Sequence, residues 1–155
     1  SGFGPLMVQT VKDSGCGCIV MHPGDEGPGG VCQRVRAFFE TRLREMSAAG
    51  IAAQRVCFDP GIGFGKTQEE NLRLIGSTGD VRLPGNAYLL AASRKRVIGA
   101  ACGNPPFKER LSGTIAAHTV GVMGGADFLR VHDVAAALQA AQVADAIRSV
   151  KNGYH

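Results

Sequence analysis

Polar side chains that could bind an anion or a polar ring follow four short apolar runs of this sequence. The runs and their polar ends are Gly17–Met21 with His22, Arg55–Phe58 with Asp59, Ala87–Ala92 with Ser93, Arg94 and Lys95, and Phe128–Val131 with Arg130, His132 and Asp133. Apolar runs of this length are typical of parallel strands buried on both faces. Functional groups collected at the carboxyl ends of parallel strands indicate a ligand site.

The stretch FDPGIGFGKT, residues 58–67, contains three glycines and a lysine and could be a phosphate loop. A Walker loop needs a glycine where Pro60 stands, and proline has no N–H to offer a phosphate. The glycine spacing does not fit a dinucleotide fingerprint either. What is left is Asp59 at a strand end and Phe64 on a glycine-rich loop, a pair that could hold a planar heterocycle by hydrogen bonding and stacking. The alternative is a flexible loop with a solvated Asp59.

Two further groups of side chains favour binding of an anionic ligand. Ser93 to Arg96 places three cations where a strand turns into a helix, whose N-terminus attracts negative charge; a solvated basic turn is the alternative. Alternation along a strand puts Arg130 and His132 on one side and Val131 on the other, which suits a phosphate or pyrophosphate. Among the other histidines, His22 could line the mouth of the site, whereas His118 and His155 are expected to be structural or at the surface.

Helical segments alternate with the four strands. They are Pro5–Ser14, Gln33–Ala49, a segment that begins with a capping box at Thr67 to Glu70, Leu111–Met123, and Val134 to about Val150. The segment after the capping box carries Leu72, Leu74 and Ile75. In Leu111–Met123, Gly113 and Gly121 could permit close packing on the sheet. Asp133 can cap the last helix, which has Leu138, Ala141 and Ile147 on one side. This order predicts an α/β fold with a parallel sheet and right-handed crossovers. The pattern alone does not separate a closed barrel from an open sheet. No linker appears, so residues 1–155 are expected to form one domain.

Composition narrows the function classes. The chain has 155 residues and a net charge of +4, with no dense basic run, which fits an anionic small substrate and gives little support to nucleic-acid binding. No apolar run approaches the roughly 18–20 residues of a membrane span, and the N-terminus lacks a signal-peptide pattern. Five cysteines without a CxxC pair predict buried free thiols and a cytoplasmic protein. Cys16, Cys18 and His22 lack a second pair of ligands for a tetrahedral metal site.

Together these motifs resemble the dihydropteroate synthase family, the pterin-binding enzymes of folate biosynthesis. The matching segments are Val20 to His22, Asp59 to Lys66, Ser93 to Lys95, Arg110 to Gly113 and Arg130 to Asp133. The family is a (β/α)8 barrel that joins a 6-hydroxymethyl-7,8-dihydropterin pyrophosphate to para-aminobenzoate. The resemblance covers nearly the whole chain and implies the last four strand–helix units of that barrel.

The resemblance also implies roles for individual residues. Asp59 and Lys95 would hold the pterin ring, with Met21 packed near it and Gly63 as a further substrate contact. Phe64 and Ser93 would contact para-aminobenzoate, and Arg130 and His132 would bind the pyrophosphate. Lys95, Arg130 and His132 are therefore the expected catalytic residues. The family also implies Mg²⁺, with its ligand in the first half of the barrel, and a homodimer.

The sequence departs from the family in two places. Pro23 to Gly30 replaces the usual continuation after Met21-His22, so the contacts of this loop stay open. The family's first half is absent, and free apolar edges at the first and last strands would be prone to pairing. We therefore expect the chain to be a piece of a longer polypeptide or to pair with a separate half. A related pterin-binding methyltransferase, or a non-catalytic half barrel acting as a partner subunit, are the alternative functions.

Overall fold

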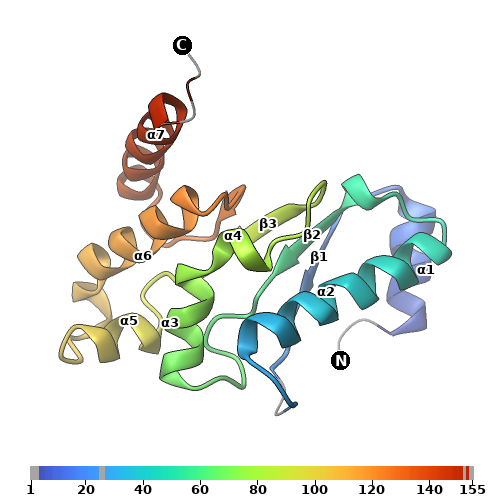
Figure 1. Ribbon diagram of the computed structural model, residues 1–155, viewed down its shortest axis with the longest axis horizontal. Coiled ribbons are helices and arrows are strands. Elements are labelled where there is room, and N and C mark those ends of the chain that lie inside the picture. Colours follow the sequence, from blue (N-terminus) through green and yellow to red (C-terminus); the bar gives the residue numbers. More distant parts are fainter. Residues whose placement is uncertain (1–3, 25–26, 152, 154–155) are drawn as a thin grey trace.

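The computed structural model of the chain describes residues 4–24, 27–151 and 153. Four parallel strands form one sheet in the order of the chain (Figure 1). They are β1 Cys18–Met21, β2 Val56–Asp59, β3 Ala87–Leu90 and β4 Phe128–Leu129. Met21 pairs with Asp59, and Leu89 pairs with Phe128. All four strands were predicted, and their carboxyl ends meet at one edge of the sheet because the strands are parallel.

The order β1-β2-β3-β4 answers the question that the sequence pattern left open. In a doubly wound open sheet the strand order reverses at a switch point. Here each strand pairs with the next one along the chain, and helical segments connect consecutive strands. This is the arrangement of consecutive units in a β/α barrel.

The predicted helices form with small shifts at their ends. The helical elements are α1 Pro5–Ser14, α2 Val31–Ala48, η1 Ala53–Arg55, α3 Gln68–Gly76, α4 Thr78–Val81, α5 Arg96–Ala101, η2 Phe107–Glu109, α6 Leu111–Met123 and α7 Val134–Lys151. The capping box at the start of α3 is confirmed: the amide of Glu70 donates to Thr67 Oγ1 at 3.2 Å, and the amide of Thr67 donates to Glu70 Oε2 at 2.9 Å. Leu74 and Ile75 of this helix are buried, whereas Leu72 is exposed.

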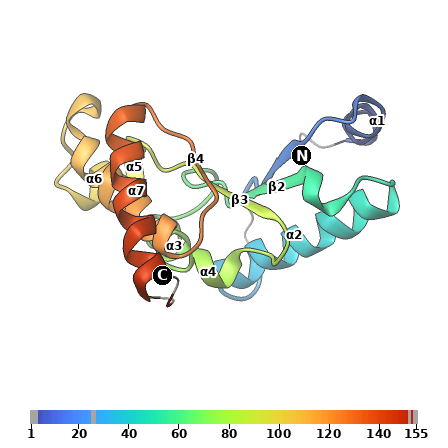
Figure 2. The same cartoon turned by 90° about the horizontal axis from the view of Figure 1, so that it is seen from above.

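The two faces of the sheet have different environments. Val20, Phe58 and Tyr88 point to the face that packs against the helices and are almost fully buried. Seen from above in Figure 2, α2, α3 and α4 lie along the same side of the strands. On the opposite face Ile19 and Phe128 are each 55% exposed. The prediction that the strands are buried on both faces is therefore wrong for β1 and β4, whereas Leu89 of β3, which lies on the same face, is only 8% exposed.

Glycines allow α6 to pack closely, on the sheet at Gly121 as predicted but on α5 at Gly113. A Cβ added at Gly121 would overlap the side chain of Leu90 in β3, and one at Gly113 would stand 2.7 Å from Ile98 in α5. In α7, by contrast, the predicted apolar side is wrong. Leu138 and Ile147 are exposed, and the helix buries Ala137 and Ala144 instead, because small side chains let α7 lie close to α6.

The structure also bears on the predictions about membrane spans and cysteines. Among the described residues, no helix combines the length and apolarity needed to cross a membrane. All five cysteines are free thiols. Cys16 and Cys102 are exposed, and Cys18, Cys32 and Cys57 are half-buried, so the prediction that the thiols are buried is wrong.

Candidate active site

The turn after β3 is held in an unusual backbone conformation. Arg94 has a φ of 56°, which non-glycine residues rarely adopt. Its amide donates to Thr114 Oγ1 at 2.9 Å, and its carbonyl accepts from the Arg110 guanidinium at 3.2 Å. Its side chain donates twice to the Asp133 carboxylate, at 2.9 and 2.6 Å. These contacts fix the turn that presents Ser93 and Lys95.

The pairing of Arg94 with Asp133 changes two expectations from the sequence. Arg94 was predicted as one of three cations available to an anion, but its charge is matched by a carboxylate. Asp133 was predicted to cap α7. It precedes the helix, and its carbonyl accepts the Ala137 amide, while its side chain joins the end of β4 to the turn after β3. Bidentate pairing of this kind fixes geometry as well as charge.

A cavity of about 400 Å³ opens at the carboxyl edge of β3 and β4. Its lining residues come from the two strand ends and from η2: Ala91, Ser93, Arg94, Lys95, Phe107, Arg130, Val131 and His132. The Ser93 hydroxyl lies 2.9 Å from His132 Nδ1 and accepts the His132 amide at 3.2 Å. Four of the predicted site residues are thus brought together. Val131 also borders the cavity, contrary to prediction, because β4 ends at Leu129 and strand alternation stops there.

Phe107 is a residue of this cavity that the sequence did not indicate. Its ring meets the His132 ring edge-on at 5.3 Å, and the Arg94 guanidinium lies over it at 5.3 Å. Phe107 is still 49% exposed and forms an apolar wall beside the cations. It begins the three-residue 3₁₀ helix η2 directly after two prolines, and an element this short has no periodic pattern that could have marked it.

Asp59 lies next to this cavity, at the end of β2. It is only 5% exposed, and Oδ1 accepts the amide of Gly61 at 2.7 Å. Burial raises the pKa of the carboxyl above its usual value, while the Gly61 amide and the cations Lys95, Arg130 and Lys66 oppose that rise. Burial likewise lowers the pKa of Lys95, with Asp59 opposing the change. The charge of Asp59 and the charge of Lys95 therefore each favour the ionised form of the other.

The glycine-rich loop between β2 and α3 carries the other predicted contacts. Lys95 Nζ lies 4.7 Å from the centre of the Phe64 ring and donates to the carbonyl of Ile62. The Gly63 amide donates to Asn71 Oδ1 at 2.6 Å. Phe64 and Gly63 are thus placed beside Lys95, although neither lines the 400 Å³ cavity. The hydrogen-bonded loop does not match the interpretation of a flexible loop.

The remaining predicted residues take different positions. Met21 is 37% exposed on the open face of the sheet and pairs with Asp59 in the strand register. His22 does not line the mouth: it is buried, its Nδ1 accepts the Gly24 amide at 3.1 Å, and its ring meets Phe38 edge-on at 4.9 Å. His118 is buried and accepts the amide of Ala92, which fits the predicted structural role. His155 lies outside the described residues.

The donor set of the site does not suit a metal ion. Among residues 4–24, 27–151 and 153, no three His, Cys, Asp or Glu side chains form a group that could hold one. The charged side chains that line the cavity are the cations Arg94, Lys95 and Arg130, which favour an anion. These residues do not by themselves fit the Mg²⁺ site that the resemblance implies.

Comparison with known proteins identifies the family. A sequence model described as "Pterin binding enzyme" matches residues 2–132. This is most of the chain. The chain belongs to the pterin-binding enzyme family. Its four strand–helix units are accordingly part of the (β/α)8-type α/β fold of that family.

Individual pterin-binding relatives agree with this assignment. The chain is 38% identical to the dihydropteroate synthase of Synechocystis, over 77% of this chain and 41% of the relative. It is 35% identical to a mitochondrial folate synthesis bifunctional protein of Arabidopsis thaliana, over 92% of this chain and 29% of the relative. It thus spans less than half the length of these two relatives.

Solved structures of pterin-binding enzymes resemble the chain closely. A Xanthomonas albilineans dihydropteroate synthase with 4-aminobenzoic acid superposes with a TM-score of 0.86 at 34% identity, over 94% of this chain and 54% of that chain. A Burkholderia cenocepacia dihydropteroate synthase complexed with 7,8-dihydropteroate gives 0.87 at 34% identity, over 96% and 59%.

Proposed function

We propose that the protein to which this chain belongs is a dihydropteroate synthase of folate biosynthesis. It would condense 6-hydroxymethyl-7,8-dihydropterin pyrophosphate with para-aminobenzoate to give 7,8-dihydropteroate and pyrophosphate. The observation that carries the proposal is one edge of the sheet, where the buried Asp59 adjoins the cations Lys95 and Arg130 and the Ser93–His132 pair. The names of the relatives in sequence and structure support the same reaction.

The pterin ring would be anchored by Asp59 and Lys95. A carboxylate accepts hydrogen bonds from the ring N–H and amino groups, and an ammonium donates to ring acceptors. Burial of Asp59 strengthens such bonds because little water competes for the carboxylate. Met21 and Gly63 would complete the pterin contacts, and Phe64 and Ser93 would contact para-aminobenzoate.

Arg130 and His132 would hold the pyrophosphate and favour its departure. In the proposed reaction the bond between the pterin methylene carbon and the pyrophosphate oxygen breaks, and the oxygen keeps the electron pair. The arylamine nitrogen then bonds to the methylene carbon and loses a proton. Cations fixed around the leaving group stabilise the charge that develops there. Lys95, Arg130 and His132 are accordingly the proposed catalytic residues.

Further parts of the proposal concern the whole protein. We propose that Mg²⁺ takes part and that its protein ligand lies outside this chain; we assign it no step. The rest of the barrel would come from the same polypeptide or from a second chain. A homodimer is supported by exposed apolar residues on α7, among them Leu138, Ile147 and Val150. A cytoplasmic location is supported by the free cysteines.

The proposal is tested with the full-length protein and any chain that co-purifies with it. Pterin pyrophosphate and para-aminobenzoate should give dihydropteroate, and Lys95→Ala or Arg130→Ala should lower kcat/KM by roughly 100-fold. The exposed Lys12→Ala and Arg44→Ala serve as matched controls and should leave it unchanged. Unchanged turnover in the site variants would refute the site. Binding of methyltetrahydrofolate without use of para-aminobenzoate would indicate the methyltransferase instead.

A further inference from the structure

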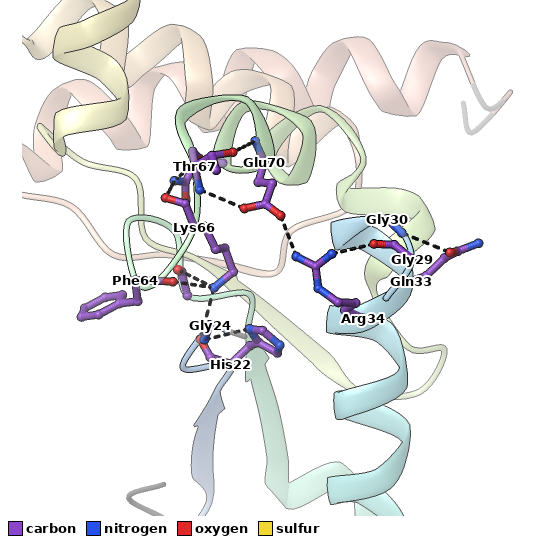
Figure 3. A network of polar contacts seen from close by, with 12 residues as sticks. His22, Gly24, Gly29, Gly30, Gln33, Arg34, Phe64, Lys66, Thr67 and Glu70 are labelled. Atoms are coloured by element: carbon purple, nitrogen blue, oxygen red, sulfur yellow. Dashed lines mark hydrogen bonds and ion pairs between the residues drawn. The ribbon is translucent and has the colours of Figure 1, made fainter. Parts of the chain in front are cut away.

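Lys66 joins the two loops that follow β1 and β2. Its ammonium donates to the carbonyls of Gly61 at 3.1 Å and Phe64 at 3.0 Å, and it lies 3.4 Å from the carbonyl of His22 (Figure 3). The first two carbonyls belong to the glycine-rich loop and the third to the loop after β1. An ammonium can donate in several directions at once, so Lys66 can bond carbonyls of both loops together.

The two loops also approach each other more closely than side chains would allow. Gly61 has a φ of 70°, and a Cβ there would overlap the carbonyl oxygen of His22. Gly24 has a φ of 95°, and a Cβ there would stand 2.6 Å from the carbonyl oxygen of Phe64. These glycines therefore permit contact between the loops and do not simply add freedom. Close backbone approach of this kind is a recognised use of glycine.

A second set of bonds holds the far side of the glycine-rich loop. Asn71, in α3, is 4% exposed; it accepts the Gly63 amide and donates to the carbonyl of Thr67 at 2.7 Å. Arg34 of α2 pairs with Glu70 at 2.6 Å, which links the start of α3 to the neighbouring helix (Figure 3). The segment from Gly61 to Phe64 is thus held at both sides, with Lys66 on the side that faces the loop after β1.

Lys66 also contributes charge at Asp59. The charged and titratable groups that act on or respond to this carboxyl come from β2 and its loop, β3 and its turn, and the end of β4: Cys57, Lys66, Tyr88, Lys95 and Arg130. Among these, three are cations. Lys95 is already engaged with Phe64 and Ile62, and Lys66 is fixed by backbone carbonyls. Because its position does not depend on a ligand, its charge is present before binding.

We propose that Lys66 is a positioning residue of the pterin subsite. Its ammonium fixes the loop that carries Gly63 and Phe64 against the loop after β1, and its charge favours the carboxylate form of Asp59. This inference rests on the proposed function for its ligand, but the loop contacts that it explains are independent of any substrate. Lys66 acts through these neighbours and is not assigned a contact with the reacting atoms.

The test replaces Lys66 by methionine, which keeps the length of the side chain and removes the charge, in the full-length protein. Binding of pterin pyrophosphate is measured by calorimetry across pH. Lys66→Met should weaken binding by roughly tenfold, because the loop that carries Gly63 and Phe64 loses the hydrogen bonds of a charged donor. It should also move the acid limb of the binding profile to higher pH, because Asp59 loses one of the cations that favour its carboxylate form. Lys66→Arg should return the acid limb toward its original position. Lys12→Met, on the exposed surface of α1, is the matched control.

Hydrogen exchange separates failure of this inference from failure of the proposed function. The Gly63 amide donates to Asn71 Oδ1 of α3, and the Phe64 amide donates to the Gly61 carbonyl within the loop. They should exchange faster in Lys66→Met than in the original protein, whether or not a pterin is present. If the original protein binds no pterin, the proposed function fails while the loop contacts are still tested. A Lys66→Met protein with unchanged exchange and an unchanged pH profile would overturn the inference.

Discussion

Protonation of His118 should destabilise the protein in mild acid. His118 is 1% exposed, and its Nε2 accepts the Ala92 amide at 3.3 Å, so the ring proton sits on Nδ1. That Nδ1 has no hydrogen-bond partner among the described residues. A second proton would have to enter at Nε2, where it would face the Ala92 N–H without solvent. Burial accordingly lowers the pKa of His118 from 6.5 to about 4.

The size of the effect follows from this difference in pKa. Above pH 6.5 both the folded and unfolded proteins carry neutral imidazole, so there is no penalty. Below pH 6.5 the unfolded chain takes up a proton that the folded chain refuses until about pH 4. The free energy of unfolding should therefore fall by about 2 kcal/mol at pH 5, and by at most about 3 kcal/mol below pH 4.

The assay is urea denaturation of the full-length protein at pH 7.5 and pH 5. His118→Gln keeps an acceptor for the Ala92 amide and removes the titration. The loss of unfolding free energy between the two pH values should be about 2 kcal/mol smaller in His118→Gln than in the original protein. Other titrating groups act equally in both proteins and cancel. Equal losses in the two proteins would refute this account of His118.

Two further substitutions test the supports of the site. Asp133→Ala removes both hydrogen bonds of the Arg94 side chain and should lower the free energy of unfolding by about 2 kcal/mol in urea denaturation; a loss below about 0.5 kcal/mol would mean that the pair behaves as an ordinary surface contact. Gly61→Ala should cost about 2 kcal/mol more than Gly103→Ala, which shares a positive φ but has open space around its Cβ; equal thermal stabilities of the two variants would contradict the loop packing.

The parts of the fold that could be predicted from the sequence are those that depend on neighbouring residues in the chain. Apolar runs gave the four strands, and the capping box at Thr67 gave the start of α3. The exposure of Ile19 and Phe128 could not be predicted in the same way. A run of apolar residues shows that a strand prefers burial, but it does not show whether the residues that would cover it belong to the same chain.

The sequence predicted the polar residues of the candidate site but not the residues that hold its loops and wall in place. Ser93, Lys95, Arg130 and His132 were expected at strand ends, and the structure places them around one cavity. Lys66 was noted only as the end of a failed nucleotide motif and as part of the segment that resembles the family, because one of its carbonyl partners, His22, lies 44 residues away in the sequence. The wall formed by Phe107 was missed for a similar reason: contacts between loops follow from the assembled sheet and leave no periodic pattern.

The most direct test of the central claim is the stoichiometry of product formation by the full-length protein. Pterin pyrophosphate and para-aminobenzoate should yield one dihydropteroate for each pyrophosphate released, and release should require both substrates. Arg130→Ala should lower both products together, because it removes a proposed pyrophosphate contact. Absence of dihydropteroate with a folded protein and both substrates present would contradict the account, as would pyrophosphate release that does not respond to Arg130→Ala.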